Sequence, residues 1–313
     1  MEECPFKKVL IPLTQSEQSK RSIIFASKVF NEIKIPLEVT LLHVVCTESF
    51  ISTHMKNIDL RTELLKESEI FQQLKKEYIS DIIYPFLKNY AQLIKKFCPE
   101  IQIKIRIEEG EPGNKIVEIV KKENISTIVM ARRGLSTFKG MLLGSVSHKV
   151  IHSLKYKNIY LVGEKVTEDT FLEIRKILIP VDGSIYSQKA LEHALCLIKY
   201  LKNIEKISLI RVINVDLFEE RKKQGINPKE EAEKVIEESK KKLKNVIPEN
   251  IITTKIGIGI PGDEIVKEIE EGNYDLVIIG RKGRTSLEDI ILGRVSIEVI
   301  NRCLDVTIVL INL

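Results

Sequence analysis

Short apolar runs alternate with longer segments of helical period along the whole chain. The apolar runs are rich in Val, Ile and Leu, and the segments between them carry apolar residues at the three- and four-residue spacing of an amphipathic helix. Regular alternation of strand and helix is typical of βαβ units, which build an α/β fold around a parallel sheet. The pattern predicts strands at 8–13, 37–45, 101–107, 127–131 and 158–162, and again at 176–181, 207–215, 251–258, 275–279 and 306–311.

The second set of strands repeats the first. The run KVLIPL that begins at Lys8 matches KILIPV at Lys176, 168 positions later, whereas GEPG at 110–113 matches GIPG at 259–262 with an offset of 149. The first copy therefore carries 19 extra residues, which give it a longer region after its second strand. We predict a first domain over residues 1–163, a polar linker over 164–174 and a second domain over 175–313.

The inserted region is rich in aromatic residues. Two interpretations stay open: an exposed surface for a protein partner, or rings that pack the longer helix onto its own sheet, which the burial preference of aromatic side chains favours. Pro85 predicts a break between two helical pieces. The aromatic residues are Phe71, Tyr78, Tyr84, Phe86, Tyr90 and Phe97.

The residues best suited to bind a ligand follow strands one and four of the second copy. Strand four is followed by GRKG at 280–283 and then, after nine intervening residues, by Gly293 at the start of the last helix. Glycines let backbone N–H groups approach a phosphate, and a helix N-terminus adds unpaired donors and a favourable dipole. Asp182 ends strand one and places a carboxylate near a base or sugar. The pattern predicts a phosphate-binding site, with tight turns and a helix cap as the structural alternative.

Basic residues flank these glycines. Such residues more often belong to solvated loops than to a phosphate clamp, and their place beside the glycines keeps phosphate contact open as the alternative. They are Arg281, Lys282 and Arg284, with Arg132 and Arg133 in the first copy. His148 and His152 lie four apart on a helix without a third ligand, so we predict no metal site. No catalytic triad, nucleophile elbow or Walker loop is present, so covalent catalysis has no candidate.

Composition narrows the class of protein. Hydrophobic residues make up 43% of the 313 residues and charged residues 30%, with a net charge of +5, which predicts neither a disordered chain nor a nucleic-acid binder. No apolar stretch is long enough to span a bilayer, so we expect no membrane insertion. The N-terminus lacks the apolar core of a signal peptide, and the five cysteines form no C-x-x-C pair. We therefore expect a cytoplasmic protein.

The chain resembles the universal stress protein family in its tandem two-domain form. The resemblance covers nearly the whole chain and rests on IPVDGS at 179–184, DLVIIGRKG at 275–283 and the G-x2-G-x9-G spacing from Gly280 to Gly293. It implies two tandem, doubly wound, five-stranded parallel sheets of strand order 3-2-1-4-5, like the adenine-nucleotide alpha-hydrolases. It also implies bound ATP, with or without Mg²⁺.

The resemblance assigns the site residue by residue. The adenine and ribose would lie against Val181, Asp182 and Val212. The ribose and α-phosphate would lie along Gly280, Lys282 and Gly283. The outer phosphates would lie at Gly293, Arg294, Val295 and Ser296. Arg294 departs from the family's Ser or Thr, and its guanidinium either pairs with phosphate or fills the space a phosphate needs.

The first copy departs further. Thr14 and Gln15 replace the Asp-Gly pair, and Ala131 replaces the first glycine with a methyl beside the ribose. We expect a weaker, degenerate second site there. The family's phosphate-loop residues that the first copy keeps are Gly134, Gly144, Ser145 and Ser147.

Function follows from the resemblance. It implies a stress-response protein that binds ATP mainly in the second domain as a regulatory ligand, with slow ATPase activity at most, because no general base is evident. The alternative is a nucleotide-independent interaction module in which Arg294 blocks the phosphate cradle. The resemblance also implies that strands 158–162 and 306–311 meet and make each chain a pseudo-dimer. Association of two chains through the insertion stays open, and no protein partner is identified.

Overall fold

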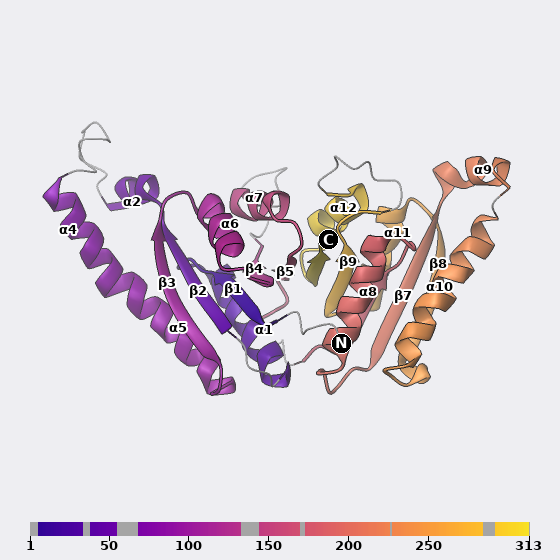
Figure 1. Cartoon of the computed structure of the whole chain (residues 1–313), viewed down its shortest axis with the longest axis horizontal. Helices are drawn as coiled ribbons and strands as arrows, with labels where there is room; N and C mark the ends of the chain where they lie inside the picture. Colours follow the sequence, from indigo (N-terminus) through magenta and orange to yellow (C-terminus); the bar gives the residue numbers. More distant parts are fainter. Residues whose placement is uncertain are drawn as a thin grey trace.

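The computed structural model describes residues 6–33, 38–54, 68–132, 144–169, 173–225, 227–283 and 292–312. These residues form one ten-stranded sheet of order β3-β2-β1-β4-β5-β10-β9-β6-β7-β8 (Figure 1). The first-half strands are β1 (Lys8–Pro12), β2 (Glu38–Val45), β3 (Gln102–Glu109), β4 (Thr127–Ala131) and β5 (Asn158–Val162). The second-half strands are β6 (Lys176–Pro180), β7 (Lys206–Asn214), β8 (Ile252–Gly259), β9 (Leu276–Gly280) and β10 (Thr307–Ile311).

Each half has the strand order 3-2-1-4-5, which confirms the order that the resemblance implies. All pairs within a half are parallel, and the pair that joins the halves, β5 with β10, is antiparallel. Ile308 lies opposite Leu161 and Leu310 opposite Ile159. The two five-stranded sheets therefore continue into one.

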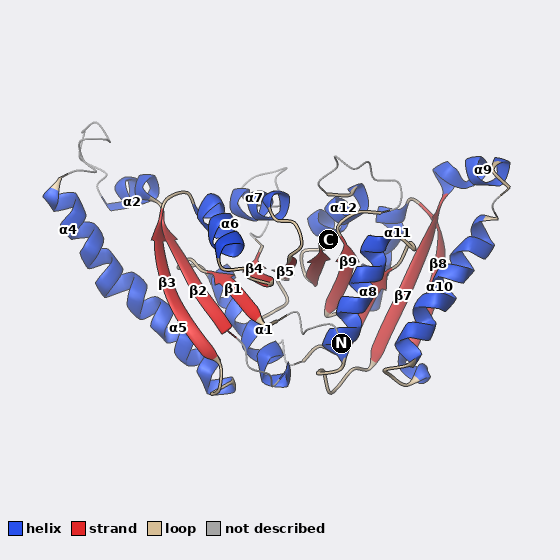
Figure 2. Cartoon of the chain, in the orientation of Figure 1, coloured by secondary structure: helices blue, strands red, loops and turns tan. Residues whose placement is uncertain are grey.

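Helices cover both faces of this sheet (Figure 2). The first-half helices are α1 (Glu17–Ile33), α2 (Thr47–His54), α4 (Glu69–Tyr78), α5 (Tyr84–Phe97), α6 (Pro112–Lys122) and α7 (Ser145–Ser153). The second-half helices are α8 (Ile185–Ile198), α9 (Val215–Lys223), α10 (Pro228–Lys244), α11 (Pro261–Gly272) and α12 (Arg294–Arg302), with a 3₁₀ turn at Glu249–Ile251. None of the described helices is long and apolar enough to cross a membrane.

Two apolar layers hold the fold together. Side chains of α1, α5, α8 and α10 pack on one face of the sheet, and those of α6, α7, α11 and α12 pack on the other. Neighbouring residues of β1 serve both layers: Val9 points into the first and Leu10 into the second, and both are fully buried. Burial on both faces explains why the six inner strands are continuous apolar runs. They are β1, β4, β5, β6, β9 and β10. The edge strand β3 is partly exposed and alternates apolar with polar residues.

The insertion forms a nearly continuous helical rod along the outer edge of the first half (Figure 1). The predicted break at Pro85 is wrong, because α4 continues through a π-helical turn at Ile79–Ile83 directly into α5. Pro85 lies in the first turn of α5, where the preceding wide turn accommodates the residue that has no N–H. Phe71 is buried, and Phe86 and Tyr90 pack against the core, so these rings hold the rod on its own sheet.

Candidate functional site

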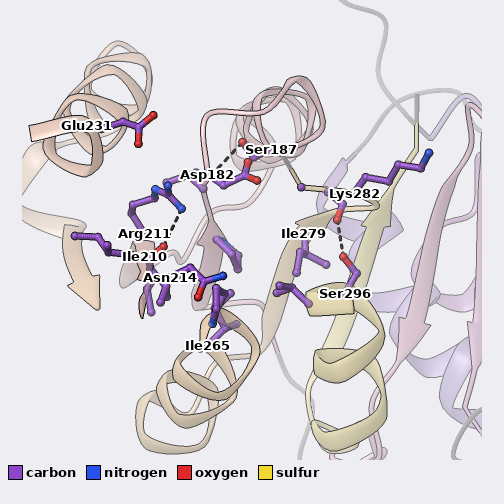
Figure 3. Close-up of a pocket in the computed structure, with 18 of the residues that line it drawn as sticks. Asp182, Ser187, Ile210, Arg211, Asn214, Glu231, Ile265, Ile279, Lys282 and Ser296 are labelled. Atoms are coloured by element: carbon purple, nitrogen blue, oxygen red, sulfur yellow. Dashed lines mark hydrogen bonds between the residues drawn. The ribbon is translucent and has the colours of Figure 1, made fainter. Parts of the chain in front are cut away.

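A pocket lies at the carboxyl ends of β6, β7 and β9 in the second half (Figure 3). Its volume is about 170 Å³. Strand order reverses between β6 and β9, and such a switch point is where open α/β sheets bind ligands. Eight of the ten residues assigned from the sequence line it: Val181, Asp182, Val212, Gly280, Lys282, Gly283, Val295 and Ser296.

Asp182 is held in a defined orientation. Its Oδ1 accepts a hydrogen bond from the backbone N–H of Ser184 at 2.9 Å, and its own backbone N–H donates to Oγ of Ser187 at 3.3 Å. Ser184 in turn caps α8 by accepting from the N–H of Ser187. The structural alternative for Asp182, a turn at the start of a helix, is therefore present, and it fixes one carboxylate oxygen. The other, Oδ2, lies on the side of Gly283.

The two outer glycines of the spacing allow close packing of the backbone. A Cβ at Gly280 would lie 2.7 Å from main-chain atoms of Tyr186, so glycine lets the end of β9 approach α8. A methyl group at position 280 would thus face the helix α8. Gly293 donates its N–H to the carbonyl of Arg281 at 2.8 Å, and this bond holds the start of α12 against the loop after β9.

The N-terminus of α12 forms one wall of the pocket. Val295 and Ser296 line it, and the buried hydroxyl of Ser296 donates to the carbonyl of Gly280 at 2.8 Å (Figure 3). The first N–H groups of a helix have no partner inside the helix, and the dipole there favours an anion. Gly293 and Arg294 do not line the pocket, and Arg294 is exposed at the first position of α12.

The first half has a cavity at the equivalent place, between β1, β2 and β4. Its volume is about 1160 Å³, so the half with the degenerate motif holds the larger space. Gly144, Ser145 and Ser147 line it, whereas Gly134 falls outside the described residues. Thr14 takes the place of Asp182, and its Oγ1 lies 2.9 Å from Oγ of Ser16.

His43 in this cavity stands where the second half has Arg211. Its Nδ1 lies 2.9 Å from the carbonyl oxygen of Leu13, and burial lowers the pKa of the imidazole. The side chain is therefore neutral near pH 7. The first half thus lacks both the carboxylate of Asp182 and the cation of Arg211 at the base of its cavity.

Comparison with known proteins decides the family. The sequence model of the universal stress protein family matches residues 5–156 and again residues 173–309. The chain belongs to the universal stress protein family. Universal stress protein MJ0577 of Methanocaldococcus jannaschii is 32% identical over 148 residues, 41% of this chain and 89% of that protein. YxiE of Bacillus subtilis is 30% identical over 145 residues, 46% of this chain and 91% of that protein.

A solved universal stress protein shares the arrangement of both halves. The crystal structure from Archaeoglobus fulgidus covers 98% of each chain with a TM-score of 0.65 and 20% identity. At that identity the likeness concerns the fold alone. It shows that the tandem α/β architecture recurs in the family.

Sequence reasoning missed several lining residues of this universal stress protein. They come from the end of β7 and from α9 and α10, which close the pocket on the side away from the glycines (Figure 3). The residues are Arg211, Asn214, Phe218, Arg221 and Glu231. The sequence pattern pointed to the loops after strands one and four. Applying the same rule to strand two would have found Asn214, whereas α9 and α10 reach the pocket only through tertiary folding.

Two arginines overturn the expectation of solvated loop residues. Arg132 and Arg281 are 1% and 4% exposed, and both side chains bond to backbone carbonyls of the opposite half. Lys282 does line the pocket, as assigned. Arg133 and Arg284 fall outside the described residues.

The histidine pair on α7 shows contact between its rings. The rings of His148 and His152 stack with centroids 4.1 Å apart. The described part of the chain holds no group of three or more His, Cys, Asp or Glu that is arranged to bind a metal ion.

Proposed function

We propose that this universal stress protein binds ATP in its second half and uses the nucleotide as a regulatory ligand in a stress response. One observation carries the proposal. A single pocket at the switch point brings together the carboxylate of Asp182, the glycine loop at Gly283 and the N-terminus of α12.

The pocket offers each part of ATP a suitable surface. Val181, Val212 and Ile265 present apolar side chains for the base, and the carboxylate of Asp182 is an acceptor for ribose hydroxyls. Lys282 and the N-terminus of α12 favour the phosphates. Mg²⁺ would enter with the phosphates, because this ion keeps most of its water ligands.

We propose that hydrolysis is slow at most. Among the described residues, the two carboxylates that line the pocket already have partners: Asp182 accepts from Ser184, and Glu231 lies 3.7 Å from Nη1 of Arg221. A general base for water must lie within hydrogen-bond reach of it and be available to take a proton. Neither carboxylate meets both conditions.

The alternative is a nucleotide-independent interaction module in which Arg294 blocks the cradle. The position of Arg294 supports ATP binding instead, since the side chain is exposed and lies outside the lining of the pocket. We further propose that the protein is cytoplasmic and that the β5–β10 pairing makes each chain its own pseudo-dimer. Sedimentation of the full chain tests the separate alternative of a homodimer through the inserted helices.

Titration calorimetry with ATP tests the site. We expect about one ATP per chain, and loss of binding on Gly283→Val or Asp182→Ala. The matched control is Thr14→Ala, which removes the equivalent side chain of the first half and should leave the affinity unchanged. Undiminished binding in both second-half variants would contradict the site, and no binding by the unaltered protein would favour the interaction module.

A further inference from the structure

Arg132 and Arg281 occupy the same position in the two copies, directly after β4 and β9. Each extends its side chain across the β5–β10 boundary. Burial of a guanidinium is costly unless its N–H groups are paired. The acceptors of these two side chains therefore show what each arginine does.

Arg132 holds the C-terminal end of α12. Its Nη1 donates to the carbonyl of Ile300 at 2.9 Å, and its Nη2 donates to the carbonyls of Leu304 at 2.9 Å and Val306 at 2.5 Å. The last carbonyls of a helix have no partner inside the helix, and a cation at that end interacts favourably with the helix dipole. The first half thus supplies the C-terminal anchor of a second-half helix.

Arg281 makes the reciprocal contact. Its Nη1 donates to the carbonyl of Leu154 at 2.6 Å, and Leu154 is the C-terminal cap of α7. The same nitrogen lies 3.2 Å from Oδ1 of Asn312, which follows β10. The main chain of Arg281 is meanwhile part of the glycine loop, because its carbonyl accepts from Gly293.

The two anchored helices are the ones that carry the phosphate-loop residues. The N-terminus of α12 lines the second-half pocket, and the N-terminus of α7, with Ser145 and Ser147, lines the first-half cavity. Each helix has nine residues. A short rigid helix moves as a unit, so a displacement of its anchored C-terminal end also displaces the N-terminal end that faces the ligand.

We propose that Arg132 and Arg281 are positioning residues that couple the two sites, each fixing the helix that forms the other half's phosphate cradle. The inference rests on ATP binding in the second half. Coupling between sites is reciprocal. A ligand in the first-half cavity would therefore change the affinity of the second half for ATP, and ATP would change the affinity of the first half for that ligand by the same factor.

The decisive variant is Arg132→Met, which lies in the first half and does not line the second-half pocket. We expect its ATP affinity, measured by calorimetry, to fall about tenfold, within the usual range of coupling between sites. The ATP affinity of Arg132→Lys should fall by less, because an ammonium group keeps the charge but lacks the planar fork with which the guanidinium reaches several carbonyls. Far-UV circular dichroism checks that the variants are folded.

Tyr160→Phe is the matched control. The Tyr160 hydroxyl lies 2.7 Å from Nε2 of His193, so this variant also removes a buried hydrogen bond between the halves, but one that touches neither α7 nor α12. We expect its ATP affinity to stay within twofold of the unaltered protein. An unchanged affinity in folded Arg132→Met, or an equal loss in Tyr160→Phe, would overturn the coupling.

Hydrogen exchange provides a test that survives a failure of the variants to fold. In the unaltered chain, saturating ATP should slow amide exchange in α12 and also in the last turn of α7, on the far side of the β5–β10 boundary. Slowing confined to the second half would overturn the coupling. If the unaltered chain binds no ATP, the proposed function fails, and faster exchange in α12 of nucleotide-free Arg132→Met still tests the anchor.

Discussion

Gly283 lies against the carboxylate of Asp182, so that a Cβ at Gly283 would stand 2.9 Å from Oδ2 of Asp182. The two residues come from loops that follow different strands, and their contact brings the carboxylate and the glycine loop to one edge of the pocket. A side chain at position 283 must therefore displace the carboxylate of Asp182. Because Asp182 lines the pocket, this displacement changes the shape of the ligand site.

The contact predicts non-additive effects on nucleotide affinity. Gly283→Ala should weaken ATP binding about tenfold, because the added methyl pushes the carboxylate from its position. In an Asp182→Ala background the same substitution should cost much less, since the clash is then absent. Calorimetry on the single and double variants measures this difference, and fully additive losses would show that the two residues act independently.

Arg294 offers a test between the two proposed functions. If its guanidinium pairs with the outer phosphates, Arg294→Ser should weaken ATP binding about three- to tenfold and reduce its dependence on salt. If the guanidinium instead fills the cradle, the same change should strengthen binding. Titrations at two ionic strengths give the answer, with Arg294→Lys as the control that keeps the charge.

Acid should destabilise the protein through His193, which lies buried beside Tyr160. Burial lowers the pKa of His193 from its ordinary 6.5 to about 3 in the folded chain. The unfolded chain then binds more protons than the folded one between these values, so the stabilisation is complete above about pH 6.5 and is lost as the pH falls toward 3.

Between pH 7 and pH 5 this single histidine should reduce the free energy of unfolding by about 2 kcal/mol. Urea unfolding at the two pH values measures the change. His193→Gln keeps a side chain that accepts a hydrogen bond from Tyr160 but does not titrate. The decrease in its free energy of unfolding between pH 7 and pH 5 should therefore be smaller by about 2 kcal/mol. Equal losses in both proteins would assign the acid sensitivity to other groups.

The helices that follow the third strand of each half, α6 and α11, begin differently, which predicts opposite effects of substitution. Glu111 caps α6, accepting from the N–H groups of Gly113 at 3.0 Å and Asn114 at 2.7 Å. Ile260 at the start of α11 gives no side-chain cap. Glu111→Ala should lower the free energy of unfolding by about 1 kcal/mol, and Ile260→Ser should raise it by several tenths. Urea denaturation of both variants checks the pair, and a loss of stability in Ile260→Ser would contradict the capping argument.

Much of the fold was predictable because a parallel sheet and its covering helices have a distinctive pattern of apolar residues in the sequence. Strands buried on both faces must be apolar throughout, and the helices between them must be amphipathic, so runs such as 8–13 and 176–181 stand out without any structure. The glycine spacing from Gly280 to Gly293 was likewise readable, since a close approach of backbone to backbone requires the absence of a Cβ.

The sequence by itself determined the repeated unit, its strand positions, the glycine loop and, by resemblance, the family and the strand order. Only the tertiary structure decided the destinations of long side chains and the size of each cavity. Arg281 looks like a solvated loop residue until the two halves meet and place the carbonyl of Leu154 within its reach. The path of α9 and α10 over the pocket is decided in the same way. Periodicity records the local environment of a residue. The contacts of Arg281 and Arg132 instead join segments more than a hundred residues apart, which only packing brings together.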